Sequence, residues 1–178
     1  MFTLSLEIAE IMFDPKTKQI VDVFFRKDIK FKCQRCAVFC CRLGGPKLNV
    51  KDLQRLEKAG YKLEIYVDNT KKKKSDNERF LKEKEDGSCI FLKHNVESKN
   101  YTCTIYEFRP SVCRFYPFEF LSTDHSTGVL RIIPCCNGLN ASDEEPVDRK
   151  FIEENLFESI IDSIESYLGN LNVRDRLV

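Results

Sequence analysis

Apolar side chains occupy alternate positions at the start of the chain, at Phe2, Leu4, Leu6 and Ile8. A period of two predicts a strand with one buried face. Turn-forming residues follow at 14–17, and residues 19–26 are a second run rich in β-branched and aromatic side chains. The start of the chain therefore predicts a β-hairpin.

Two segments have apolar residues at helical spacing. In the first, Val50, Leu53 and Leu56 form one stripe, which Asn49 can cap and Gly60 can end. The second predicts a long C-terminal helix from Pro146 to about Leu171. Its apolar stripe is Phe151, Ile152, Leu156, Ile160, Ile164 and Leu168.

Shorter apolar runs fill the middle of the chain. Three of them predict short strands, at Leu63–Val67, Cys89–Leu92 and Tyr101–Ile105. An aromatic run at Phe115–Phe120 predicts a core strand with Val129–Ile133 as its antiparallel partner. The segment Glu107–Arg114 predicts a short helix, with Pro110 accepted in its first turn.

Size and charge narrow the class of protein. The 178 residues and 20.8 kDa predict one domain over residues 1–178. The formal charge of +1 offers no global field for nucleic acid, and the lysines at 71–74 are expected in a solvated loop. No apolar stretch approaches 18 residues, so no membrane partner is expected. Because Glu7 and Glu10 interrupt any apolar leader, we expect mature protein in the cytoplasm.

Cysteines are the most specific chemical feature. They are Cys33, Cys36, Cys40, Cys41, Cys89, Cys103, Cys113, Cys135 and Cys136. A CxxC step lets two thiolates hold one ion at roughly 2.3 Å. In extended backbone, successive side chains point to opposite sides, so Cys40 and Cys41 are expected to serve two ions, or one ion and one packing role. The pattern predicts two all-cysteine metal sites.

Two alternatives to this interpretation were weighed. Disulfides fit poorly because the number of cysteines is odd and no signal peptide is recognised. Histidine ligands fit poorly because His94 and His125 both lie in predicted loops, without a second histidine at ligand spacing. All-thiolate sites suit both structural zinc and iron–sulfur clusters, and the spacing alone does not choose between them.

The cysteine order and its flanking residues resemble the YkgJ-type cysteine-cluster family, described as zinc- or iron-chelating and related to flagellin lysine N-methylases. The matching segments within about 31–140 are Cys33-Gln34-Arg35-Cys36 with Cys40-Cys41, and residues 48–56, 86–92, 103–118 and 136–138. The resemblance implies eight shared metal ligands: Cys33, Cys36, Cys40, Cys41, Cys89, Cys103, Cys113 and Cys136. In two places the chain departs from the family pattern. Three residues instead of two precede the doublet Cys40-Cys41, and Cys135 is an extra thiol.

The predicted elements and the cysteine sites together predict an α+β fold, a small metal-stapled single domain with short antiparallel strands, an N-terminal hairpin and a long C-terminal helix. The family resemblance covers only about residues 31–140 of it. The cysteines and the resemblance together imply a cytoplasmic metal-binding protein with one or two all-cysteine zinc or iron–sulfur sites. The alternatives are an S-adenosylmethionine-dependent protein-lysine N-methylase, and a redox or metal-delivery module. A metal ion is the expected partner, beside a possible protein partner or substrate.

Four arginines lie within a few residues of the cysteines: Arg35, Arg42, Arg109 and Arg114. Each is a candidate donor toward a thiolate site, because four thiolates around Zn²⁺ carry a net charge of about −2. Aromatic residues crowd Cys113, so at least one site is expected to be dry. These surroundings favour an iron–sulfur cluster, although a closed zinc site would accept the same shell.

Overall fold

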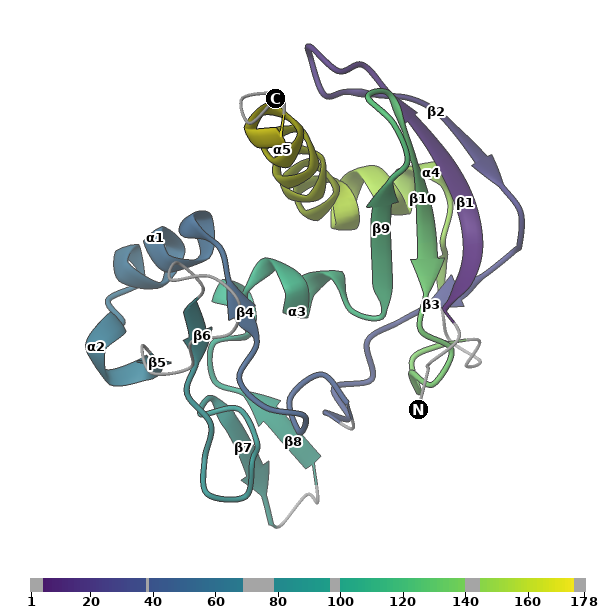
Figure 1. Cartoon of the computed structure of the whole chain (residues 1–178). Coiled ribbons are helices and arrows are strands. Elements are labelled where there is room, and N and C mark those ends of the chain that lie inside the picture. Colours follow the sequence, from purple (N-terminus) through teal and green to yellow (C-terminus); the bar gives the residue numbers. More distant parts are fainter. Residues whose placement is uncertain (1–4, 38, 69–78, 97–99, 140–144, 175–178) are drawn as a thin grey trace. The chain divides into compact units, whose positions relative to one another are not determined.

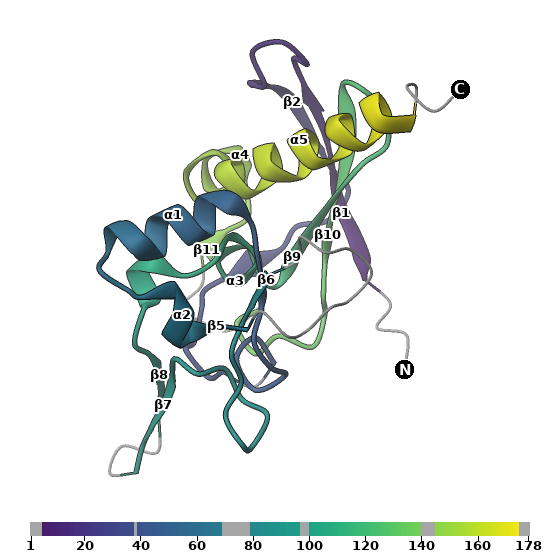
Figure 2. The same ribbon diagram turned by 60° about the vertical axis from the view of Figure 1, so that its left-hand side comes forward.

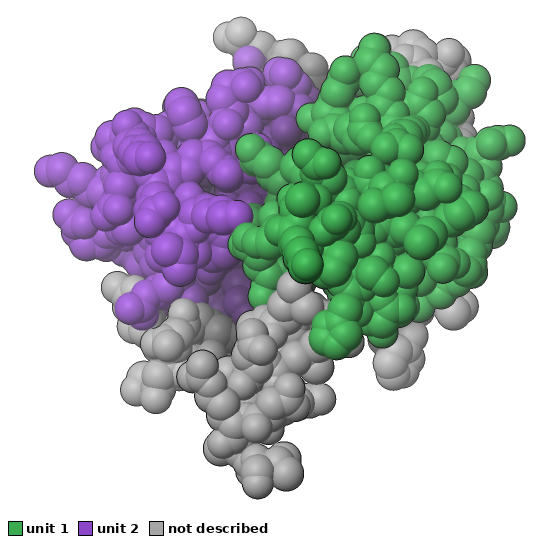
Figure 3. Space-filling model, turned by 90° about the horizontal axis from the view of Figure 1, so that it is seen from above, with its two compact units in different colours: residues 1–32, 115–178 green, residues 33–114 purple. Residues whose placement is uncertain are grey.

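A computed structural model describes residues 5–37, 39–68, 79–96, 100–139 and 145–174, and the side chains of the last helix as far as Glu165. The chain divides into two compact units (Figure 3). The first unit joins residues 1–32 to residues 115–178, and the second unit is residues 33–114. The expectation of one domain for the whole chain stays a prediction. The lysine run at 71–74 lies outside the described residues.

The first unit is built on a four-stranded antiparallel sheet of order β2-β1-β10-β9 (Figure 1). Its strands are β1 (Leu6–Phe13), β2 (Ile20–Phe25), β9 (Phe118–Ser122) and β10 (Thr127–Ile132). The predicted N-terminal hairpin is confirmed by the pairing of β1 with β2, and the aromatic strand has its expected partner in β10. Of the alternating residues that predicted the first strand, Ile8 is buried, Leu6 is exposed, and Phe2 and Leu4 lie outside the described residues. Asp14 shapes the first turn, because its carboxylate accepts from the N–H groups of Lys16 and Thr17 at 2.7 and 2.9 Å.

The C-terminal helix covers one face of this sheet (Figures 1 and 2). It runs through α4 (Arg149–Phe151), a π-helical turn η2 (Ile152–Leu156) and α5 (Phe157–Arg174). Its buried stripe packs with the inner strand residues into one apolar core. The stripe is confirmed at Ile152, Leu156, Ile160 and Ile164, while the side chain of Leu168 lies outside the description.

The helix begins three residues later than the sequence predicts. Pro146 lies in a short strand, β11 (Glu145–Pro146), which pairs with β3 (Lys30–Phe31). Asp148 then caps the helix, since its carboxylate accepts from the N–H of Phe151 at 2.8 Å. The capping side chain therefore sets the start. No helix within the described ranges is long and apolar enough to cross a membrane.

The second unit consists of short elements. Its strands are β4 (Lys47–Leu48), β5 (Val67–Asp68) and β6 (Arg79–Leu81) in one sheet of order β4-β6-β5, and β7 (Leu92–Asn95) with β8 (Asn100–Cys103) in a hairpin. Its helices are α1 (Val50–Lys58), α2 (Leu63–Tyr66), the 3₁₀ turn η1 (Tyr106–Phe108) and α3 (Ser111–Phe115). The mixed short strands and helices match the predicted α+β class.

Two of the short strands were predicted in the wrong place. The run Leu63–Val67 is helical as far as Tyr66, and only Val67 begins a strand. Five apolar-rich residues are too few for their periodicity to separate a strand from one helical turn. The strand expected at Cys89–Leu92 begins at Leu92, and Cys89 makes only an isolated bridge to Glu83. His94 consequently lies in β7 rather than in a loop.

The single helix predicted over Glu107–Arg114 is also wrong. The chain forms η1, leaves helical geometry at Arg109 with φ −51° and ψ 141°, and starts α3 at Ser111. The ring of Pro110 clashes with a helical conformation of the residue before it, so Arg109 is extended. Pro110 therefore separates two short helices rather than opening one.

Candidate metal centre

The first four cysteines lie on a loop without regular secondary structure. Arg35 and Ala37 both have positive φ, at 50° and 53°, a region that side chains other than glycine seldom adopt. The chain then turns at Cys40 and Cys41, so the two adjacent thiols line the same pocket. The expectation that they point to opposite sides is wrong, because it assumed an extended backbone.

Cys89 and Cys103 are held by main-chain contacts. The N–H of Cys89 donates to the carbonyl of Cys41 at 2.8 Å, which ties Cys89 to the doublet. Each of the two sulfurs also receives a hydrogen bond from the N–H two residues later, from Phe91 and from Ile105. Donors of this kind favour the charged form of a thiol and are common around thiolate-bound metals.

Cys113 is positioned by a buried carboxylate. Asn49 caps α1 as predicted, and Asp52 completes the capping box with it. Asp52 is 2% exposed, and its Oδ1 also accepts from the N–H and the hydroxyl of Ser111, at 2.8 and 2.9 Å. Asp52 thereby joins the start of α1 to the start of α3, which carries Cys113.

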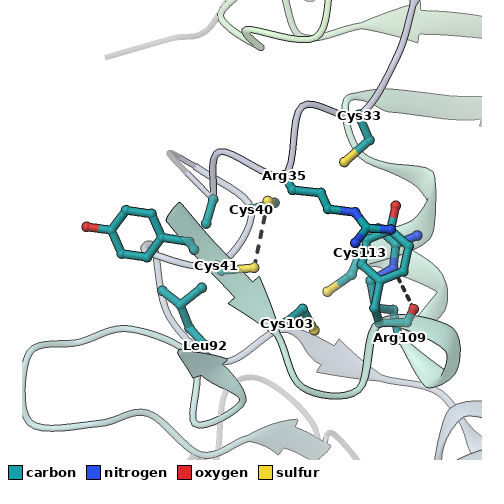
Figure 4. A pocket seen from close by; sticks show the side chains of 11 residues that line it. Cys33, Arg35, Cys40, Cys41, Leu92, Cys103, Arg109 and Cys113 are labelled. Carbon is teal, nitrogen blue, oxygen red and sulfur yellow. Dashed lines mark hydrogen bonds between the residues drawn. The ribbon is translucent and has the colours of Figure 1, made fainter. Parts of the chain in front are cut away.

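A single pocket in the second unit collects five thiols. Its cysteines come from three parts of the sequence, and they are Cys33, Cys40, Cys41, Cys103 and Cys113. In Figure 4 four of these sulfurs face one shared space, those of Cys40, Cys41, Cys103 and Cys113. The two adjacent sulfurs are 3.8 Å apart. The pocket encloses about 400 Å³ with its open mouth included.

Cationic and aromatic side chains form one wall of the pocket. The guanidinium groups of Arg35 and Arg109 both lie over the ring of Tyr106, at 4.3 and 3.6 Å from its centre. The Nε–H of Arg109 also donates to the Tyr106 carbonyl at 2.9 Å. Two of the four predicted arginines, Arg35 and Arg109, therefore line the pocket beside the thiols, and both stack on Tyr106. Tyr106 was not identified from the sequence as part of the site. The position of Tyr106 between Cys103 and Cys113, in a segment that matches the family, could have indicated this role.

The other two arginines lie elsewhere. Arg42 packs over the ring of Tyr101 at 4.5 Å and donates to the Tyr101 hydroxyl. Tyr101 itself lines the pocket, so Arg42 reaches it only through that ring. Arg114 follows Cys113 in α3 and is half-buried. Neither arginine is among the described residues that line the pocket.

Burial and neighbouring thiols favour the neutral form of several thiols in the second unit. Burial raises the pKa of Cys89, Cys103 and Cys113, and neighbouring thiols raise the pKa of Cys113 further. The hydrogen bond between Cys40 and Cys41 raises the pKa of Cys41 and lowers that of Cys40 to about 7. The positive charge of Arg109 lowers the pKa of Cys40, Cys103 and Cys113, in part opposing the burial of the latter two.

The donor set suits a thiophilic metal. Thiolates of this kind bind structural zinc or iron–sulfur clusters, and the main-chain donors and Arg109 would stabilise their negative charge. Within the described residues, however, no three Cys, His, Asp or Glu side chains lie close enough together to hold an ion. The thiols therefore share a pocket without forming closed coordination geometry.

Four of the cysteines do not line this pocket: Cys36, Cys89, Cys135 and Cys136. Cys36 is half-buried and is not among its lining residues. Cys136 is half-buried and Cys135 is exposed, and both belong to the first unit. There, Gly138 lies against the main chain of Lys32, where an added Cβ would come within 2.4 Å of the Lys32 carbonyl oxygen. The glycine after Cys136 is therefore required by packing.

The two histidines are placed apart from the thiol pocket. His94 stacks on Tyr101, with ring centres 4.6 Å apart. His125 is exposed in the turn between β9 and β10. Neither side chain lines the pocket among the residues that the structure describes. The prediction that only cysteines supply the donors stays a prediction.

Comparison with known proteins supports the chemistry of this pocket. Residues 32–137 match the model of the CxxCxxCC family, whose description reads "Putative zinc- or iron-chelating domain". An uncharacterized protein of Methanocaldococcus jannaschii is 32% identical over 145 residues, which cover 76% of this chain and 72% of that protein. No solved structure matches the chain. The family name has two residues before the cysteine doublet, whereas this chain has three, residues 37–39.

Proposed function

We propose, from the premise that this chain belongs to the CxxCxxCC family, that it binds zinc or iron through cysteine thiolates in its second unit. The observation that carries the proposal is the pocket into which Cys33, Cys40, Cys41, Cys103 and Cys113 converge. The site works in the reducing cytoplasm, where thiols stay available for metal.

Cys89 belongs to the same proposed site. It is 6% exposed, its N–H is bonded to the Cys41 carbonyl, and its sulfur accepts from the N–H of Phe91. Cys36 and Cys136 complete the family's set of eight and are proposed as ligands on the family resemblance alone. When bound, the metal would cross-link segments that have little other regular structure. The chain's own residues would hold it, neutralise its charge through Arg109 and shield it with Tyr106.

Metal identity is the first property to measure. Protein purified without oxygen should contain stoichiometric iron with acid-labile sulfide, absorb broadly near about 400 nm as thiolate-bound clusters do, and bleach with dithionite. Colourless protein with stoichiometric zinc and no sulfide would assign the site to zinc and reject the cluster. Protein that contains neither metal, and takes up neither under reducing conditions, would reject the proposed function.

Metal delivery is a second candidate function. It is favoured by the exposure of two pocket residues, Cys33 and Arg35, since a site that exchanges metal must be reachable from solvent. The test is the rate at which loaded protein gives zinc to a chromophoric chelator. Transfer within seconds fits delivery, whereas retention for hours fits a structural site. The methylase alternative and a redox role stay predictions of the resemblance.

A further inference from the structure

Cys40 and Cys41 are adjacent in sequence, yet their sulfurs lie on the same side of the chain. They face one pocket (Figure 4), and the distance between them is 3.8 Å. Four thiolates bound at about 2.3 Å to a tetrahedral ion stand about 3.8 Å apart. The doublet is thus already set at the separation of two ligands of one ion.

A hydrogen bond between two thiols could produce the same distance, so the surroundings matter. The N–H of Cys89 fixes the Cys41 carbonyl at 2.8 Å, which holds the turn that places both sulfurs on one side. Two further sulfurs, those of Cys103 and Cys113, face the same space. Four thiols therefore line one space without Cys36 or Cys136, and they would have to close in to coordinate one ion.

We infer that Cys40 and Cys41 bind the same metal ion as a chelating pair, with Cys103 and Cys113 as the remaining ligands. The inference rests on the proposed function and assigns ligands within it. It reverses the expectation that adjacent cysteines serve different ions. Arg109, which lies over Tyr106 beside this set, supplies positive charge to a site whose four thiolates carry a net charge of about −2 with Zn²⁺.

Zinc stoichiometry in variants of the full chain tests the pair. Cys40→Ser, Cys41→Ser and the double variant are loaded with zinc under reducing conditions against a competing chelator. Native mass spectrometry then counts the tightly bound ions. If the two thiols share one ion, each single variant and the double variant lose the same single ion. Cys135→Ser, an exposed thiol of the first unit, is the control and should keep the wild-type content.

Different results separate the inference from the proposed function. A double variant that loses more ions than either single variant, or a single variant with wild-type content, would overturn the shared site while leaving metal binding intact. Wild-type protein that binds no zinc or iron would overturn the proposed function itself.

A measurement on unaltered protein avoids any loss of folding in the variants. After loading with ¹¹³Cd²⁺, the Hβ protons of Cys40 and Cys41 should both couple to one cadmium resonance, which also couples to Cys103 and Cys113. Coupling of the adjacent cysteines to two different resonances, or of only one of them to cadmium, would contradict the inference.

Discussion

The two units are of similar length but differ in what fills them. Among the described residues, the core of the first unit contains fifteen buried side chains drawn from a sheet and a long helix. The corresponding cluster of the second unit contains seven, one of which is Cys89, and two further thiols, Cys41 and Cys103, pack against it. The second unit thus has a smaller apolar core, and thiols form part of it and of its border.

The smaller core of the second unit suggests where the proposed metal would contribute to stability. Burial of apolar surface is the main favourable term in folding, and small cores leave little net stability. A structural metal can contribute on the order of 10 kcal/mol in zinc-site peptides at neutral pH. We therefore expect the first unit to fold by burial and the second to depend on its ligands.

Removal of one core side chain from each unit should give the largest effect of a single substitution. Ile160→Ala in the first unit should lower its stability by about 2–5 kcal/mol, with or without metal, because it leaves a cavity in a fully buried site. Leu56→Ala in the second unit should cost a similar amount, and because we expect that unit to be less stable without metal, the variant should unfold there after chelation and stay folded while metal is bound. Urea unfolding with and without chelator measures both, and equal metal dependence in the two variants would contradict the distinction.

Substitution of Asp52 should lower stability and metal retention more than substitution of Asp148, a helix cap of the first unit. Asp52→Asn disturbs a buried carboxylate that receives several hydrogen bonds, so we expect a loss of about 1–3 kcal/mol and weaker metal retention. Asp148→Ala removes an exposed cap and should cost about 1 kcal/mol without changing metal content. Thermal melts and metal analysis of both variants test this. Unchanged metal retention in Asp52→Asn would show that Ser111 and Cys113 are positioned by other contacts.

The positive charge of Arg109 beside the thiols should strengthen metal binding, but the fold should not depend on it. Arg109→Gln should weaken zinc binding roughly 10- to 100-fold, as the loss of an outer-shell partner commonly does. Arg131→Gln is the matched control, because Arg131 pairs with Glu7 in the first unit. Competition with a chelator of known affinity measures both variants. Equal zinc affinities of the two variants would mean that Arg109 only stacks on Tyr106 and does not stabilise the bound metal.

The pH dependence of the second unit should differ between metal-free and loaded protein above about pH 8.5. In metal-free protein the raised pKa values of Cys41, Cys89, Cys103 and Cys113 stabilise the fold below the unfolded thiol pKa of about 8.5. That stability is lost as pH rises through the folded values. The lowered pKa of Cys40 acts in the opposite direction, with stability lost as pH falls through about 7. Metal binding releases thiol protons, so loaded protein should gain stability as pH rises from about 6 to 8. Melting curves from about pH 6 to 10, with and without zinc, test this difference: metal-free protein should lose stability above about pH 8.5 and loaded protein should not, whereas the same pH dependence in both would contradict it.

Periodic segments could be predicted from the sequence because their own side chains decide their structure. The hairpin of β1 and β2, the capped helix α1 and the buried stripe of the C-terminal helix all follow from apolar spacing and capping residues. Short segments failed where one local contact decides the outcome. Pro110 breaks a helix at Arg109, and Asp148 sets a helix start that the stripe alone puts too early.

The sequence predicted which residue types form the candidate site, but not which of these residues lie together. Cysteine order and spacing pointed to thiolate chemistry, and the arginines near them were recognised as possible donors. The sequence did not predict that Cys40 and Cys41 point to the same side. Their orientation depends on a turn that is fixed by a hydrogen bond from Cys89, which is distant in the sequence. The platform that Tyr106 offers to Arg35 and Arg109 likewise depends on tertiary contact.

Hydrogen exchange of the full chain, followed by mass spectrometry with and without bound metal, tests the central claim most directly. If thiolate-bound metal holds the second unit together, chelation under reducing conditions should speed exchange throughout peptides from residues 33–114. Peptides of β1, β10 and α5 should keep their protection. Equal acceleration in both units, or no change in residues 33–114 after the metal has been removed, would contradict the account.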